Sequence, residues 1–526
     1  MTSDPTTLYR GGRVHSPTDP HATALLVSGG TVAWVGPEGD APAADRVVDL
    51  DSALLTPAFV DAHMHVTDTG LTATGLDLST TRSATDVLEA VAGAAQRLPT
   101  DAVLLGHGWD ESTWPDPDRN PPDAAALERA AGGRRVYLSQ ASIHSALCSP
   151  ALLATVAPDT PGYDPSGWVR REAHRAAREV AFASISTSQR AQVQRTALRH
   201  AASLGIAAVH ECGGPGTSSE DDFTAVLALS GDALPEVYGY WGEPMGAERA
   251  RQLGALGAGG DLYADGALGS QTAHLRETYA DRADHRGYGY LTSEQVRDHL
   301  LDCHDHGVQG GFHAIGDAAL AAVLDGFAAA AAKLGPERLR AARHRIEHAE
   351  LIDRNMIARV VEYGVIASMQ PAFDRLWGGE SQMYAARLGR QRALEANPFG
   401  AMHAVGAALA FGSDSPVTPL DPWGSVRAAA CHHNPAYRMG VRSAFAAHTR
   451  GGWRAVGQDT HGVLTPGAPA TFAVWHTPAG LDGTLPVLMA ADPAEHGPQD
   501  PTPLPTCRRT VLRGRTIYDQ QQEPDR

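Results

Sequence analysis

The sequence predicts an α/β fold in which a closed barrel of parallel strands is flanked by a smaller β domain. The first observation is that Ala-rich helical stretches alternate with short apolar strands through the middle of the chain, which implies a parallel sheet. The second is that both chain ends carry short β-type runs. The third is length, because 526 residues hold a barrel, which takes about 250 residues, together with accessory segments.

The two ends of the chain share one pattern of short β-type runs separated by Gly, Pro and Asp. We expect a small antiparallel sheet at the N-terminus, and one β domain formed by residues 1–57 together with 462–526. The expected runs are 8–14, 24–27, 31–36, 46–50, 462–467, 471–475 and 510–518.

The body of the chain, residues 58–461, is expected to form the barrel. Its predicted strands lie within 54–66, 207–210, 261–265, 310–313, 344–348, 365–369 and 409–414. Residues 67–200 are too long for one crossover and contain Pro/Asp-rich loops such as 114–118. Part of that segment is therefore predicted to be an insertion over the active-site face of the barrel.

Charge and cysteine content narrow the class of protein. A net charge of -17 and the absence of any run of basic residues argue against nucleic acid or an anionic membrane as partner. The N-terminus lacks a leader pattern, and no stretch approaches the ~20 apolar residues of a membrane span. Five dispersed cysteines indicate neither a disulfide framework nor a thiolate zinc site. We expect a cytoplasmic enzyme with a small-molecule substrate. A homodimer is one assembly that it could form.

His63 and His65 form the most informative short pattern. Side chains two apart on an extended backbone point to the same face, about 6 to 7 Å apart along it, which suits one metal ion. His313, His348 and Asp414 also fall at the trailing ends of predicted strands. Barrel enzymes build their sites on that face. These five residues together predict a metal site.

Several segments carry a resemblance to a known family. They are 61–65 (DAHMH), 106–111 (GHGWDE), 264–270 (ADGALGS), 313–317 (HAIGD), 346–350 (IEHAE) and 412–417 (GSDSPV). The chain resembles the amidohydrolase superfamily, and within it the exocyclic-amide branch that includes N-substituted formamide deformylase-like proteins. The resemblance spans nearly the whole chain and implies a (β/α)8 TIM-type barrel with a flanking β-sandwich.

The resemblance also implies a ligand set and a mechanism. His63, His65, His313 and His348 would bind one or two divalent metals, with Zn2+ as the expected ion. Imidazole nitrogen, carboxylate oxygen and an open water position make up a hydrolytic zinc site. Asp414 would take a proton from the metal-activated water and return it to the leaving nitrogen.

The scarcity of lysine bears on the metal count. Many binuclear relatives bridge their metals through a carboxylated lysine on the fourth barrel strand, where this chain has Asp261. Its only lysine, Lys333, lies in the helix predicted after the His313 strand. A carboxylated lysine is therefore excluded. The alternatives are one metal, or a bridge from a carboxylate, for which Asp261 and Glu172 are the candidates.

A Gly-rich segment is the first candidate to contact substrate. Gly106 and Gly108 permit close approach of the backbone, so that Trp109 and Asp110 would line the pocket. The alternative is that Trp109 is buried beneath the insertion.

Further substrate contacts follow from the resemblance. His144 resembles a histidine that would polarise the substrate carbonyl. Ser142 stands where Asp is expected, which points to a different substrate from that of well-studied relatives. Asp265, four residues after Asp261, and Gln271 are additional candidates.

The predicted function is hydrolysis of an exocyclic C–N bond in a small amide, formamide or related carboxamide. The first alternative is a heterocycle deaminase or cyclic amidohydrolase, because the same metal chemistry serves both. The second is a metal-binding relative without catalytic activity, which the altered residues at Asp261 and Ser142 suggest.

Overall fold

The computed structural model describes residues 5–111, 114–115, 120–140, 145–215, 217–231, 233–490 and 497–522. The chain folds as two compact units. One consists of Met1–His65 with Leu198–Arg526, and the other is Val66–Ala197. The first unit contains the parallel barrel and the strands from both chain ends.

The barrel is an eight-stranded parallel sheet in the order β19-β18-β17-β16-β15-β14-β13-β7. Its strands are β7 (Phe59–Met64), β13 (Ile206–Gly213), β14 (Glu236–Trp241), β15 (Gly257–Ala258), β16 (Gln309–Ala314), β17 (Arg345–His348), β18 (Ile366–Met369) and β19 (Ala408–Phe411). The last and first strands meet just beyond β19, where Asp414 N donates to His63 O (2.8 Å) and His65 N to Ser415 O (2.9 Å). The barrel is nearly closed, and the predicted fold class is confirmed.

Two barrel strands differ from the prediction. β14 was not predicted, and the strand expected at 261–265 is wrong, because β15 has only two residues and ends at Ala258. Gly260 follows β15 with a φ of +73°, a left-handed conformation that ends the extended run. After it, Tyr263 keeps only an isolated bridge to His313. Asp261 therefore lies on a loop at the end of β15.

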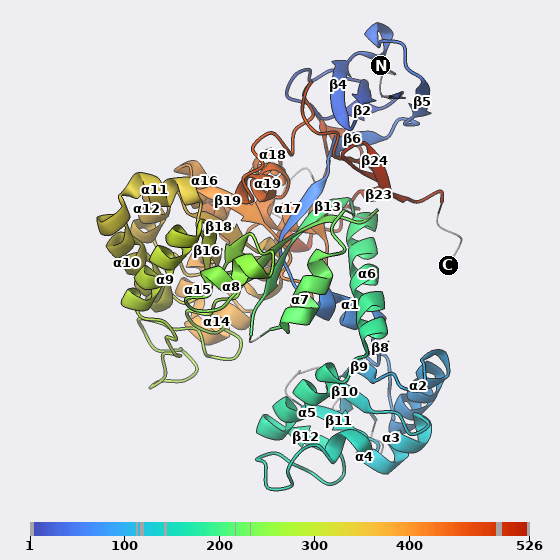
Figure 1. Cartoon of the computed structure of the whole chain (residues 1–526), viewed down its shortest axis with the longest axis vertical. Coiled ribbons are helices and arrows are strands. Elements are labelled where there is room, and N and C mark those ends of the chain that lie inside the picture. The colour runs from blue at the N-terminus through green and yellow to red at the C-terminus, as the bar shows by residue number, and fades with distance from the viewer. Residues whose placement is uncertain are drawn as a thin grey trace. The chain divides into compact units, whose positions relative to one another are not determined.

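Helices of the first unit lie outside the barrel strands (Figure 1). A Thr292 capping box begins α9, and Gly307 at φ +67° ends it. Among the described residues no single helix is long and apolar enough to cross a membrane, although the bent pair α10 and α11 passes by length and composition. The helices are α7 (Glu220–Leu227), α8 (Ala247–Gln252), α9 (Ser293–His306), α10 (Asp317–Leu334), α11 (Pro336–Ala342), α12 (Arg354–Tyr363), α13 (Pro371–Trp377), α14 (Met383–Leu388), α15 (Arg390–Glu395), α16 (Phe399–Ala404), α17 (Pro422–Ala430), α18 (Val441–Ala447) and α19 (Arg450–Ala455), with α6 (Thr187–Ser203) shared between the units.

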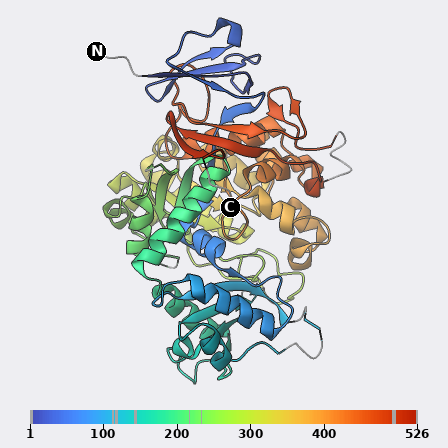
Figure 2. The same cartoon turned by 90° about the vertical axis from the view of Figure 1, so that its right-hand side faces the viewer.

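Strands from the two chain ends lie side by side, blue beside red in Figures 1 and 2. They form the sheets β4-β3-β1-β5 and β2-β6-β20-β23-β24. The expected antiparallel sheet is wrong in one respect, because β1 pairs with β5 in parallel. The expected strand at 462–467 is absent from the described residues, since Gly462 and Gly467 both adopt positive φ. The strands are β1 (Thr6–Arg10), β2 (Arg13–Val14), β3 (Ala24–Ser28), β4 (Thr31–Gly36), β5 (Arg46–Asp49), β6 (Leu54–Pro57), β20 (Phe472–His476), β23 (Thr506–Leu512) and β24 (Arg515–Asp519), with a separate hairpin of β21 (Leu481–Asp482) and β22 (Leu485–Pro486).

The second unit, Val66–Ala197, is built on a five-stranded sheet in the order β12-β11-β10-β9-β8. Two apolar clusters form its core, one of them around Trp109 and Trp114. Its elements are α1 (Val66–Thr74), β8 (Leu76–Asp77), α2 (Ala84–Arg97), β9 (Leu104–Trp109), α3 (Ala124–Ala130), β10 (Val136–Gln140), β11 (Ser145–Cys148), α4 (Pro150–Leu153), β12 (Trp168–Arg170) and α5 (Arg171–Ala183). The placement of this unit over the active-site face stays a prediction.

Candidate metal centre

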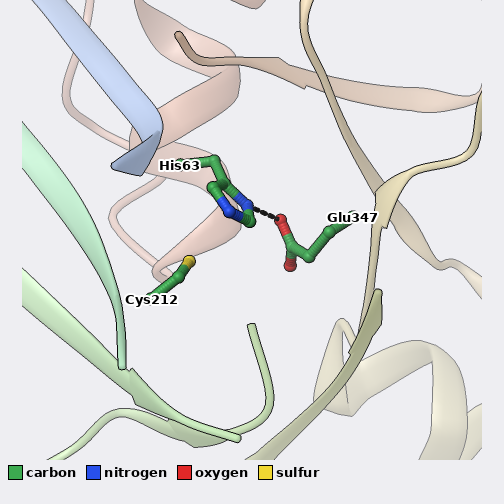
Figure 3. A group of neighbouring side chains, drawn as sticks. All are labelled: His63, Cys212 and Glu347. Carbon is green, nitrogen blue, oxygen red and sulfur yellow. Dashed lines mark hydrogen bonds and ion pairs between the residues drawn. The ribbon is translucent and has the colours of Figure 1, made fainter. Parts of the chain in front are cut away.

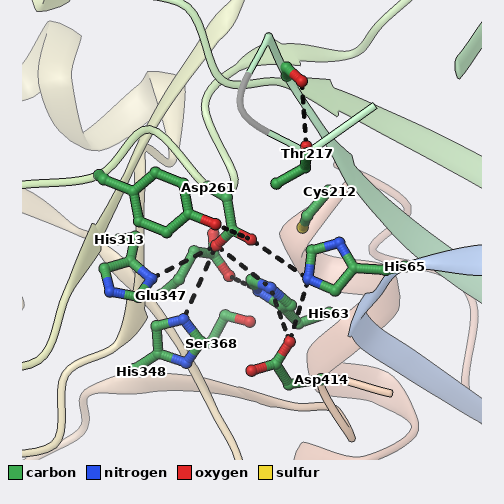
Figure 4. Close-up of polar contacts among 12 residues, drawn as sticks. His63, His65, Cys212, Thr217, Asp261, His313, Glu347, His348, Ser368 and Asp414 are labelled. Atoms are coloured by element: carbon green, nitrogen blue, oxygen red, sulfur yellow. Dashed lines mark hydrogen bonds and ion pairs between the residues drawn. The ribbon is translucent and has the colours of Figure 1, made fainter. Parts of the chain in front are cut away.

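Six polar side chains converge at the carboxyl ends of the barrel strands (Figure 4). They come from five different strands or the loops that follow them, because a closed parallel barrel brings all strand ends to one rim. They are His63 and His65 at the end of β7, Asp261 after β15, His313 in β16, His348 at the end of β17 and Asp414 after β19. We call these six residues the metal centre.

Asp261 occupies the middle of the metal centre, with imidazoles on both sides (Figure 4). Its Oδ2 lies 3.2 Å from Nε2 of His65. Its Oδ1 lies 3.5 Å from Nε2 of His63 and 3.5 Å from Nδ1 of His313. The same oxygen is 3.9 Å from Nε2 of His348. The carboxylate of this short side chain thus faces all four histidines.

Asp414, on the loop after β19, lies beside the two histidines at the end of β7 (Figure 4). Its Oδ1 lies 3.2 Å from Nε2 of His65 and 3.5 Å from Nε2 of His63. Both Asp414 and His348 adopt left-handed backbone conformations, with φ of +57° and +70°. Such conformations cost of order 1–3 kcal/mol in residues other than glycine and gather at functional sites.

Several buried atoms of the metal centre suit a cation. Within the described part of the chain, Nε2 of His63, Nδ1 of His313 and Oδ1 of Asp261 have no hydrogen-bond partner. Buried polar atoms are normally paired. The ligand atoms also fall into compact groups, which are His63 with His65 and Asp261, His63 with His348 and Asp414, and Asp261 with His313 and His348. Imidazole nitrogen and carboxylate oxygen fit a divalent transition metal such as Zn2+.

The carboxylates carry negative charge despite their burial. Burial raises the pKa of Asp261, but the neighbouring imidazoles of His63, His313 and His348 outweigh this effect and hold the pKa well below its usual value. The pKa of Asp414 is lowered for similar reasons, by His63 and His65 against the effect of burial. The metal centre therefore contains two ionised carboxylates at neutral pH.

His63 is oriented by Glu347, which lies beside it in Figure 3 and itself forms a buried ion pair with Arg345. Nδ1 of His63 donates a hydrogen bond to Oε2 of Glu347 (3.0 Å). Arg345 donates to both oxygens of Glu347, at 2.8 and 2.9 Å. Because Nδ1 carries the proton, the lone pair of Nε2 faces the metal centre. Cys212, on β13, brings its thiol within 4.8 Å of the His63 and Glu347 ligand atoms.

Two other histidines are oriented by neutral acceptors. Nδ1 of His348 donates to Oε1 of Gln370 (2.8 Å), which leaves its Nε2 toward the metal centre. Nε2 of His313 donates to the carbonyl of Gly266 (3.2 Å), which leaves Nδ1 toward Asp261. Such hydrogen bonds set the tautomer of a metal-ligating imidazole.

Asp265 and Gln271 both form hydrogen bonds with neighbouring protein groups, and Oδ1 of Asp265 also lies 4.0 Å from Nε2 of His313. The buried carboxylate of Asp265 accepts hydrogen bonds from the backbone N–H groups of His274 (2.8 Å), Ile315 (3.0 Å) and Gly316 (2.8 Å). These hydrogen bonds hold the loop after β16 in place, and a substrate contact of Asp265 stays a prediction. The side-chain amide of Gln271 donates to Asp281 (2.9 Å).

The remaining candidates lie in the second unit or outside the described residues. Trp109 is fully buried in the core of Val66–Ala197, and its indole N–H donates to the carbonyl of Leu138 (2.9 Å). This favours the alternative of a buried tryptophan over a pocket residue. Asp110 follows β9 in the same unit, and Glu172 is exposed in the first turn of α5. His144 and Ser142 lie outside the described residues.

The sequence interpretation gave no role to Arg345, Glu347 or Gln370. A usable signal existed, because Arg345 and Glu347 are two apart on β17 and so point to the same face. Charged residues two apart in a short barrel strand indicate a buried pair, since neither is fully buried alone at low cost. Gln370, one residue past β18, had no comparable signal.

Comparison with known proteins identifies the family of the chain. The model of the Amidohydrolase family matches residues 46–518. The putative amidohydrolase YtcJ of Bacillus subtilis (strain 168) is 25% identical over 511 residues, covering 90% of both chains. The N-substituted formamide deformylase of Arthrobacter pascens is 24% identical over 449 residues, covering 76% of this chain and 78% of that protein.

A solved structure shares the fold. It is an uncharacterized metal-dependent hydrolase from Pyrococcus furiosus, with a TM-score of 0.75 and 23% identity over 89% of this chain and 98% of that one. Because the family model covers nearly all of the barrel and the strands of both chain ends, the chain belongs to the amidohydrolase family.

Proposed function

We propose that this metal-dependent hydrolase cleaves an exocyclic C–N bond in a small amide or formamide, with Asp414 as general acid and base. The observation that carries the proposal is the convergence of four imidazoles and two carboxylates. Among the described residues, buried atoms of His63, His313 and Asp261 have no hydrogen-bond partner there. The similarity to a protein named N-substituted formamide deformylase supports the substrate class.

The four histidines and Asp261 would hold the metal, for which Zn2+ is the expected ion. When bound, a divalent metal would supply Lewis acidity that polarises the substrate carbonyl and lowers the pKa of bound water to about 7. The hydrogen bonds of His63 to Glu347, and of His348 to Gln370, keep the coordinating nitrogens turned toward the metal centre.

Asp414 would move the proton. As the ionised carboxylate it accepts a proton from the attacking water, and as the acid it donates that proton to the leaving nitrogen. The C–O bond forms and the C–N bond breaks, which releases a carboxylic acid and an amine. The hydrogen bond from Asp414 N to His63 O (2.8 Å) fixes the backbone of Asp414 beside the first strand.

The test combines metal analysis with a substrate screen. The purified protein is loaded with Zn2+, its metal content is measured by mass spectrometry, and N-formyl and N-acyl amines are screened for release of the amine. We expect Asp414→Asn to lower kcat by about 10²–10⁴-fold, the usual contribution of general acid–base catalysis. Asp325→Asn, which changes an exposed carboxylate paired with Arg359 on the surface, is the matched control.

Each outcome distinguishes the candidate functions. Unchanged turnover by Asp414→Asn would contradict the proposed mechanism. Ammonia released from a heterocycle, without amide hydrolysis, would favour a deaminase. A metal-loaded protein that hydrolyses none of the substrates would favour a metal-binding relative without catalytic activity.

A further inference from the structure

We propose that the Asp261 carboxylate bridges two metal ions and takes the place of the carboxylated lysine, so that assembly of the metal centre needs no carbon dioxide. The inference rests on the proposed metal-dependent function, because it concerns the same ions. The sequence left three alternatives open, which were a bridge from Asp261, a bridge from Glu172 and a site with one metal. The proposal selects the bridge from Asp261.

The grouping of ligand atoms is the first argument. His63 and His65 form one compact group with Asp261, and His313 and His348 form a second group with Asp261. Asp261 is the residue common to these two groups. Two triads that share one carboxylate provide ligands for two ions.

The two oxygens of Asp261 together reach both groups. Oδ2 lies 3.2 Å from Nε2 of His65, and Oδ1 lies 3.5 Å from Nε2 of His63. Oδ1 also lies 3.5 Å from Nδ1 of His313 and 3.9 Å from Nε2 of His348, so this oxygen faces both groups. Oδ1 is buried and has no hydrogen-bond partner among the described residues. The hydroxyl of Tyr263 donates to Oδ2 (3.3 Å) and thereby fixes the rotation of the carboxylate.

Asp414 offers a contrast within the same metal centre. Its imidazole contacts all come from Oδ1, at 3.2 Å from His65 and 3.5 Å from His63. A carboxylate that presents one oxygen to the imidazoles suits a terminal ligand or a proton acceptor. A carboxylate that presents both oxygens to imidazoles on opposite sides suits a bridge.

The chemistry of the substitution supports the same role. A carbamate on lysine and a carboxylate on aspartate both present two oxygens on one carbon atom. The carbamate forms only when lysine takes up carbon dioxide, whereas the aspartate carboxylate is permanent. The only lysine of the chain, Lys333, lies near the end of α10.

The local backbone explains how a short side chain reaches the centre. Gly260 at φ +73° turns the chain after β15, and the next residue is Asp261. A Cβ atom at Gly242, which follows β14, would lie 2.7 Å from the carbonyl carbon of Asp261. A glycine at 242 therefore allows the Asp261 backbone to pack closely against the end of β14.

The experiment measures metal stoichiometry rather than turnover. The full-length protein is stripped with a chelator and reconstituted with Zn2+ in buffer freed of carbon dioxide, with and without added bicarbonate. We expect two Zn2+ ions per chain in both buffers. Reconstitution with Mn2+ should give the electron paramagnetic resonance signal of a spin-coupled pair. Asp261→Asn, which loses the charge and one ligand oxygen, should hold at most one ion, and Asp325→Asn should hold two.

Three results would overturn the bridge. They are one ion per wild-type chain at saturation, a second ion that requires bicarbonate, and Asp261→Asn that still holds a coupled pair. If Asp261→Asn does not fold, the wild-type stoichiometry and Mn2+ signal still decide. A wild type with one ion that hydrolyses amides would refute the bridge and leave the proposed function intact. A coupled pair without amide hydrolysis would do the opposite.

Discussion

Two buried polar clusters meet at His63 and differ in how their atoms are paired. In the metal centre, Nε2 of His63 and Oδ1 of Asp261 have no hydrogen-bond partner among the described residues. In the Arg345–Glu347 pair, both carboxylate oxygens and all three guanidinium nitrogens are bonded. His63 belongs to both, with Nδ1 on Glu347 and Nε2 in the metal centre.

The contrast separates a binding site from its support. Buried polar groups without partners are costly, so they persist where a ligand completes them. A fully bonded network in a low-dielectric interior is rigid and holds its members in one geometry. The Arg345–Glu347 pair thus fixes the orientation of His63, and the metal centre leaves atoms unpaired that a cation can bind. Variants that break the Arg345–Glu347 pair, or that alter the tautomer of a histidine in the metal centre, test this difference between the two clusters.

Removing the guanidinium of Arg345 should have the largest effect. Arg345 is fully buried, and Arg345→Met leaves the Glu347 carboxylate without its cation. Loss of one partner of a buried ion pair costs about 3–5 kcal/mol. We expect the free energy of unfolding in urea to fall by that amount. Arg359→Met removes an exposed ion pair with Asp325 and should cost at most about 1 kcal/mol.

A double variant checks the cause of that loss. Arg345→Met combined with Glu347→Gln contains no buried charge at these positions, so it should be more stable than Arg345→Met alone. An Arg345→Met protein as stable as the wild type would show that the ion pair does not support the barrel.

Changing the neutral acceptor beside His348 should have a smaller effect, on metal affinity. Gln370→Met removes the oxygen that accepts from Nδ1 of His348, so the tautomer with Nε2 free is no longer favoured. Loss of such a partner typically lowers metal affinity about 10–100-fold. Competition of the protein with a zinc-binding dye measures this change.

Matched variants separate orientation from folding. Gln370→Glu retains an acceptor for His348 and should restore most of the zinc affinity, whereas the exposed Gln391→Met should leave it unchanged. If Gln370→Met binds Zn2+ as tightly as the wild type, the orientation of His348 does not depend on Gln370.

The barrel and the positions of its histidines were predictable because both follow from local pattern. A spacing of two on an extended strand places His63 and His65 on one face. Parallel closure then brings the ends of distant strands together, so that His313, His348 and Asp414 reach the same rim. These inferences need only the sequence periodicity and the topology.

The choice of carboxylate depended on packing between distant segments, which the periodicity does not contain. Asp261 was expected on a regular strand, but it reaches the centre from a loop turned by Gly260 and packed against Gly242. Trp109 was ambiguous for the same reason, because only the tertiary packing of the second unit shows that its indole is buried. Local sequence patterns therefore predicted which end of the barrel carries the metal centre. Contacts between distant segments determine which carboxylate lies in it.

The smallest predicted effect concerns His344, a buried histidine that precedes Arg345 in the chain and is neutral in the folded protein. Its Nδ1 accepts a hydrogen bond from Gly310 N (2.8 Å). Burial, together with the nearby His299 and His304, lowers its pKa from 6.5 to about 3. Below pH 6.5 the unfolded chain binds a proton at this residue that the folded chain rejects. Stability is therefore fully present above pH 6.5 and falls by about 1.4 kcal/mol per pH unit down toward pH 3.

His344→Gln keeps an acceptor for Gly310 N but has no proton to bind. The free energy of unfolding in urea, measured at pH 6.5 and 5.5, should therefore fall less for the variant than for the wild type, by up to about 1.4 kcal/mol. Carboxylates elsewhere titrate in both proteins and cancel in this difference. Equal slopes would mean that His344 takes up its proton in the folded state. The apolar surroundings of His344, which include Phe327, would then tolerate a buried charge without a carboxylate partner among the described residues.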